Sequence, residues 1–167
     1  MNDITLPVNE TYRFTLTGKT SKNYGLAYKI SQWLVTNLSG LLDDDNNVIF
    51  SKVNTGFNEN SLKTFSGKPT CDVYINNIEY STDFDESRPA TVNTIVLFYF
   101  KGANNHAYMK ACELHDYIMQ EFITNPDFQE LEGIVQNTYI KNSELMTQPI
   151  NKKWGVMGAF ELSHITF

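Results

Sequence analysis

The stretch from Val92 to Phe100 restricts the possible folds of this chain more than any other part of the sequence. Apolar side chains fall on both sets of alternating positions, which are Val92, Thr94, Val96, Phe98 and Phe100 on one side and Asn93, Ile95, Leu97 and Tyr99 on the other. Successive side chains of a β-strand point to opposite faces of the sheet, so this strand is apolar on both faces. Such strands are covered on both sides. The pattern therefore predicts a strand at the centre of a sheet.

Two other stretches change to the period of an amphipathic helix. The first begins near Ser21, weakens at Gly40, and places on one face Leu26, Ile30, Trp33, Leu34, Leu38, Leu41 and Leu42. The second begins near Asn104 and has a stripe formed by Ala107, Ala111, Leu114, Ile118 and Phe122. It should stop at Asn125-Pro126, because the residue before a proline avoids the helical conformation.

The remaining periodic stretches predict further strands. They are residues 48–53, residues 71–80 with one polar face, residues 134–140 and 144–150 paired as a hairpin around Asn142-Ser143, and a long last strand over 154–167. Residues 54–69 and 83–89 are rich in Asn, Ser, Gly, Asp and Pro, which indicates loops. The first of these loops is long enough to suggest a function of its own.

The order of these elements predicts one α+β domain. Residues 21–167 should form a mixed or antiparallel sheet packed against two amphipathic helices, with a strand and hairpin region at the C-terminus. Residues 1–20 should form an extended N-terminal arm followed by a short strand over 12–16, since apolar side chains alternate there.

Composition excludes several classes of protein. The chain has 167 residues and a formal net charge of −6, with thirteen Lys and Arg residues against nineteen Asp and Glu. This acid excess opposes non-specific adhesion to nucleic acid. No stretch approaches the ~20 apolar residues of a membrane span, and the N-terminus has no basic start of a signal peptide, so we expect no membrane partner and synthesis in the cytoplasm. Cys71 and Cys112 have no zinc spacing and are expected to be buried thiols.

Two apparent ligand motifs are incomplete. Residues 17–20 end like a phosphate-binding loop, but Arg13 stands where its leading glycine is needed. The turn Asp43 to Asn47 begins like a calcium loop, yet Val48 replaces the turn glycine and Asn54 replaces the bidentate glutamate. A solvated turn is the better interpretation.

The three histidines form no zinc-protease pair, and no serine lies in a nucleophile elbow. His106 and His115 are nine residues apart on the second helix and should point in roughly opposite directions. We therefore expect no catalytic residue, no cofactor and no metal ion. Trp154 could stack on a ligand, but packing in the core or at an interface is the preferred interpretation.

The order of the elements and the closing stretch Trp154-Gly155-Val156-Met157-Gly158-Ala159-Phe160-Glu161-Leu162 resemble the tail terminator (tail completion) proteins of tailed bacteriophages. The resemblance covers mainly residues 24–167. It implies a helix followed by three strands, a second helix over the sheet, and terminal strands. It also implies a ring that caps the tail tube, joins it to the head and lets DNA pass without specific binding.

The resemblance implies a location in the virion and three protein partners, which are further copies in a hexameric ring, the tail tube protein and the head–tail connector protein. Two sets of site residues follow as hypotheses. The apolar arm residues Ile4, Leu6 and Val8 would contact a neighbouring subunit. The acidic turns would face the DNA passage through Asp43, Asp44, Asp45, Asp83, Asp85 and Glu86.

Three alternatives stay open from the sequence. The chain could be another head–tail connector or neck protein, a cytoplasmic ligand-binding module unrelated to phages, or an enzyme with an unrecognised site. An enzyme needs clustered titratable groups in a cleft, and a ligand-binding module needs an apolar pocket with a few converging polar groups.

Overall fold

A computed structural model describes residues 22–56, 68–80, 89–101, 104–150 and 153–167. The elements in chain order are α1 (Lys22–Ser39), β1 (Lys52–Thr55), β2 (Thr70–Tyr80), β3 (Pro89–Lys101), α2 (Asn105–Thr124), α3 (Pro126–Glu130), β4 (Asn137–Ile150) and β5 (Lys153–Ile165). The prediction of an α+β fold is confirmed. The predicted arm and short strand over residues 1–20 lie outside the described residues.

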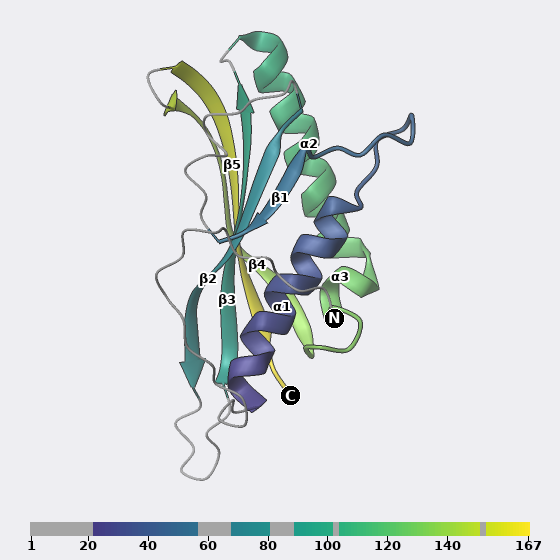
Figure 1. Cartoon of the computed structure of the whole chain (residues 1–167), viewed down its shortest axis with the longest axis vertical. Helices are drawn as coiled ribbons and strands as arrows, with labels where there is room; N and C mark the ends of the chain where they lie inside the picture. Colours follow the sequence, from purple (N-terminus) through teal and green to yellow (C-terminus); the bar gives the residue numbers. More distant parts are fainter. Residues whose placement is uncertain (1–21, 57–67, 81–88, 102–103, 151–152) are drawn as a thin grey trace, which may run out of the picture.

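The strands form one five-stranded mixed sheet in the order β1-β2-β3-β5-β4. β1 pairs in parallel with β2, and the other three pairs are antiparallel. β3 lies in the middle of this order, as its two apolar faces predict. Figure 1 shows α1, α2 and α3 on the same face of the sheet.

The main core lies between the helices and the sheet. α1 contributes Ile30 and Leu34, α2 contributes Ile118, and the sheet contributes Val96 and Phe160, all of which are fully buried. These positions follow the helical and alternating periods seen in the sequence. The two long helices are therefore held on the sheet by their apolar stripes.

The short helix α3 closes one end of this core. Its Phe128 ring packs edge-on against Trp33 of α1 at 5.1 Å and against Phe122 of α2 at 5.2 Å between ring centroids. Asn125 makes α3 possible because it ends α2 and also caps α3, with its side-chain oxygen accepting from the Asp127 amide. The sequence analysis did not predict α3.

The opposite sheet face has a smaller cluster centred on Leu97 and Tyr99 of β3. No helix of the described residues packs there (Figure 1). Leu97 is nevertheless only 8% exposed and Tyr99 only 2% exposed. Both faces of β3 are thus shielded from water.

The predicted hairpin around Asn142-Ser143 is wrong. β4 continues through these residues and pairs with β5 over its whole length, with one register shift between Ile140 and Asn142. Lys141 is the extra residue of this bulge, and its ammonium lies 3.3 Å from the Glu161 carboxylate. A bulge interrupts the alternation of side chains along a strand, and so does a turn. The sequence pattern alone does not distinguish the two, so it predicts a hairpin turn where the structure has the bulge at Lys141.

The predicted strand over 48–53 starts later than expected, and the first helix ends earlier. β1 begins at Lys52, and α1 ends at Ser39. Leu42 and Val48 lie between them and face each other in an isolated antiparallel bridge. Residues 41–49 therefore form a small projection of their own.

The N-terminus of α2 depends on a side-chain cap. The Asn104 side-chain oxygen accepts a hydrogen bond of 2.8 Å from the Ala107 amide. We expect Asn104→Ala to lower the free energy of unfolding by about 1 kcal/mol, because this amide would lose its partner. Urea denaturation of both proteins measures the difference. Asn105→Ala, one residue on and exposed, is the control, and an equal loss in both variants would contradict the role of the cap.

Candidate functional site

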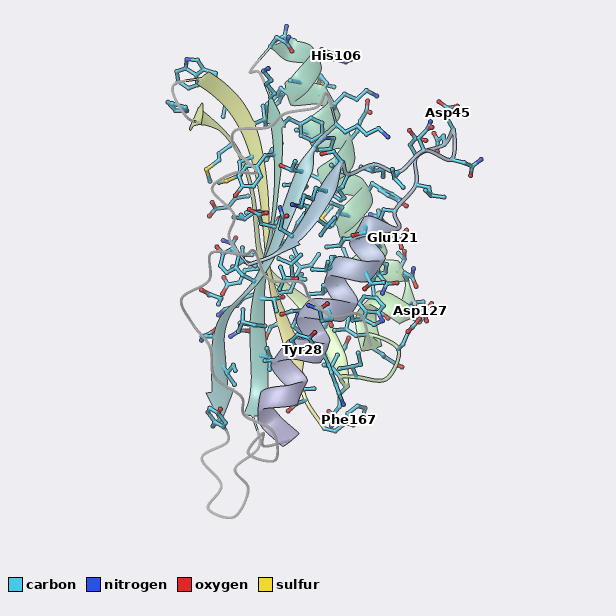
Figure 2. All side chains as sticks on the ribbon, in the orientation of Figure 1. Tyr28, Asp45, His106, Glu121, Asp127 and Phe167 are labelled. Atoms are coloured by element: carbon cyan, nitrogen blue, oxygen red, sulfur yellow. The ribbon has the colours of Figure 1, made fainter. Side chains whose placement is uncertain are left out.

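Residues 41–49 form a short hairpin that projects from the body of the domain, and we call it the acidic hairpin. The Asp43 amide donates to the Asn47 carbonyl at 2.9 Å, and the Asn46 amide donates to the Asp43 carbonyl at 3.0 Å. Asn46 has a φ of 62°, a left-handed conformation that asparagine tolerates better than most residues. Figure 2 shows Asp45 at the outer tip of the projection.

The three aspartates of this hairpin have different roles. Asp43 Oδ1 accepts hydrogen bonds from the backbone amides of Asn47 at 2.8 Å and Asp45 at 3.0 Å. These bonds, that from Asn47 first, lower the pKa of the Asp43 carboxyl. Asp43 is therefore part of the turn structure. Asp44 and Asp45 are exposed and accept no hydrogen bond that shapes the turn among the described residues.

An open groove of about 650 Å³ lies between the acidic hairpin and the N-terminal half of α2. We call it the α2 groove. Its apolar lining includes Leu42 and Val48 from the hairpin, Phe100 from β3 and Leu114 from α2. Burial raises the pKa of Tyr117 on the α2 wall, and the negative charges of Glu121 and Asp44 raise it further. The hairpin thus brings its acidic side towards α2.

The charges around the groove are mixed but mainly acidic. Lys110 and Glu113 of α2 form an ion pair of 2.7 Å with each other. The Lys68 ammonium donates to the Val48 carbonyl at 2.9 Å, so this lysine also has a nearby partner. Among the residues that the structure describes, no cation forms an ion pair with Asp44 or Asp45. The unbalanced charge of the groove is therefore negative.

The three histidines lie in different surroundings. His106 is exposed on the wall of the α2 groove, and His115 stacks on Phe160 with ring centroids 4.6 Å apart. His164 is fully buried in β5 under the helices. In the described part of the chain, no three His, Cys, Asp or Glu side chains are grouped to hold a metal ion.

His164 is a strongly perturbed titratable group of the helix-covered core. Its Nε2 lies 2.8 Å from the Thr94 hydroxyl, and its Nδ1 lies 2.9 Å from the Thr138 hydroxyl. Burial lowers the pKa of His164 to about 3. With no opening to solvent, this histidine satisfies its hydrogen bonds inside the sheet and has no access to a substrate. Sequence alternation placed it on a strand but gave no sign that it is buried.

A second buried polar group lies on the opposite sheet face. The Asn54 side-chain amide donates to the Asp72 carboxylate at 2.8 Å, and Asp72 is fully buried. Burial and the charge of Asp72 raise the pKa of the nearby Tyr99 hydroxyl. This group is also closed to solvent, so it fits a structural role better than a catalytic one.

The structure describes only part of the predicted site. Asp43, Asp44 and Asp45 are brought to the α2 groove, beside two lysines that the hypothesis of a DNA-facing turn did not include. The remaining predicted residues lie outside the described residues, namely Ile4, Leu6, Val8, Asp83, Asp85 and Glu86.

Trp154 and the two cysteines can be compared with their predictions. Trp154 is 60% exposed near the β4–β5 connection, so it does not pack in the core, and packing at an interface stays a prediction. Cys71 is buried and Cys112 is half-buried, and both are free thiols. The expectation of two buried thiols is correct for Cys71 and only partly correct for Cys112.

The chain matches no protein-family model, and a comparison with curated proteins also finds no match. None of the helices described is both long and apolar enough to cross a membrane.

Proposed function

We propose that this chain is a structural virion protein that forms a ring, caps the phage tail tube and joins the tail to the head. The observation that carries the proposal is the order of the elements. A long helix precedes three strands, a second long helix packs on the sheet, and two long strands close the chain. This is the arrangement that resemblance to tail terminator proteins implies. Because one fold can serve many functions, the proposed function also needs support from features of the surface.

The surface offers separate features for contacts with other proteins. The acidic hairpin projects on one side, and the exposed Trp154 marks the end of the β4–β5 pair. Large exposed aromatic side chains are common at the centres of protein interfaces. A ring of head-to-tail contacts needs two different patches on each subunit, one for each neighbour. The tail tube protein and the head–tail connector would bind the two ends of the ring.

The groove supports protein binding better than the alternative of a small-molecule module. Small-molecule sites enclose most of the surface of their ligand. The α2 groove is open along its length between the hairpin and α2, which suits a chain segment. We keep Asp83, Asp85 and Glu86 as candidates for the DNA passage. For Asp44 and Asp45, the apolar lining beside them favours a contact with protein over a wall of the passage.

A reconstruction of the tail end by cryo-electron microscopy tests the proposed function. We expect a closed ring of six copies between the tail tube and the connector, with DNA passing through the centre. A single copy, or a set of copies without rotational symmetry, would contradict the ring. The purified protein alone does not decide the question, because a subunit that is monomeric in solution can still join a ring in the particle. The symmetry of the assembled particle is therefore the deciding measurement.

A further inference from the structure

We propose that the α2 groove binds residues 12–19 of a second copy of this chain. The inference rests on the proposed ring and names the contact that would close it. Each copy would give one N-terminal segment to a neighbour and receive one from the other side. The chemistry recognised is an extended segment with alternating apolar side chains and basic residues.

The groove has apolar side chains that are accessible to a partner. Leu42 and Val48 on its hairpin wall are 43% and 46% exposed, although both are aliphatic. The helix-free sheet face is a poorer candidate because its central residues, Leu97 and Tyr99, are already shielded from water. Covering Leu42 and Val48 would remove apolar area from water and favour binding.

Charge favours this segment over other parts of the chain. Residues 11–20 contain Arg13 and Lys19 and no acidic residue. The groove has the exposed carboxylates of Asp44 and Asp45, whereas its two lysines already have partners. Complementary charges at an interface fix the register of the partner and suppress wrong ones.

The apolar part of the segment, Tyr12 to Leu16, and the groove also agree in length. The groove follows α2 from His106 to Tyr117, a rise of about 17 Å at 1.5 Å per residue. Five extended residues from Tyr12 to Leu16 cover about 17 Å as well. Tyr12, Phe14 and Leu16 alternate, so an extended segment would present all three to the same surface.

The length of the connecting chain excludes the groove of the same copy. α1 has 18 residues, and its length is about 27 Å. Figure 1 shows that the acidic hairpin and the N-terminal half of α2, which line the groove, lie beyond the C-terminal end of α1. The six residues from Leu16 to Lys22 reach at most about 21 Å even when fully extended. Leu16 can therefore enter the groove of a neighbour but not its own.

A peptide with the sequence of residues 11–20 tests this contact. The peptide is added to isotope-labelled full-length protein, diluted until light scattering shows a monomer, and backbone amide shifts are followed by NMR. We expect shifts that saturate and cluster at residues 41–49 and 106–117. In the double variant Asp44→Lys, Asp45→Lys, affinity should fall about tenfold, because two attractions become repulsions.

Two controls distinguish this contact from general attraction. A peptide of the same composition in scrambled order should bind much more weakly, and Asp127→Lys, on an exposed position of α3, should leave the affinity unchanged. Absence of saturable shifts in the groove, or equal binding by the double variant, would overturn the inference. Neither result would affect the ring itself, because the symmetry of the tail end is measured independently on particles.

Discussion

Replacing Gly158 by alanine is expected to lower the free energy of unfolding by about 3 kcal/mol, the upper end of the usual cost of overpacking a core. Gly158 lies in β5 opposite Phe98 of β3. A Cβ atom at position 158 would overlap the end of the Phe98 ring. The ring is fully buried between Phe100 and Phe160, with centroids 6.1 Å and 6.3 Å away, so it has little space to move. Denaturation by urea measures the loss.

A glycine in open surroundings provides the control for Gly158. Apart from the backbone of its own helix and its chain neighbours, no atom of the described residues lies within 4 Å of the position that a Cβ would take at Gly25 in α1. Gly25→Ala should therefore stabilise the domain by about 0.5–1 kcal/mol, since alanine is the better helix former. Phe98→Leu should recover part of the loss when combined with Gly158→Ala. A loss below about 0.5 kcal/mol in Gly158→Ala alone would show that the core can rearrange.

The second large effect is expected on acidification. His164 has a pKa of about 3 in the folded protein against an ordinary value of 6.5. Between these values the unfolded chain binds a proton at this residue and the folded chain does not. The contribution of neutral His164 is therefore complete above pH 6.5 and is lost as the pH falls towards 3. The slope is about 1.4 kcal/mol for each pH unit.

The His164→Gln variant separates this effect from the titration of carboxyl groups. We expect the variant to be less stable at neutral pH but to lose stability more slowly between pH 6 and pH 4. His106→Gln, at an exposed position, should keep the slope of the original protein. A direct NMR titration of the His164 ring gives a second measurement. A ring that titrates near pH 6.5 in the folded protein would refute the explanation.

The long elements could be predicted from the sequence because each has a clear period. The two-sided apolar pattern of β3 placed it correctly in the middle of the sheet. The stripe from Ala107 to Phe122 predicted the buried face of α2, and Asn125-Pro126 predicted its end. In these cases the local pattern and the tertiary environment agree.

The errors occur where local patterns have two physical explanations. Lys141 interrupts alternation as a bulge, whereas a turn at Asn142-Ser143 would interrupt it in the same way. α3 has only five residues, too few for a helical period to show. The α2 groove could not be predicted, because it combines the acidic hairpin with residues of α2 that are distant in sequence.

The order of strands also has a consequence for how the chain folds. β4 and β5 are consecutive and can form their ladder locally, but β5 must then pair with β3 across the inserted α2 and α3. Even the paired residues closest in sequence in that ladder are Lys101 and Gly155. Pairing across such a separation requires a large loop to close before the contacts form, which slows folding. We therefore expect docking of the β4–β5 pair on β3 to limit the rate at which the sheet is completed.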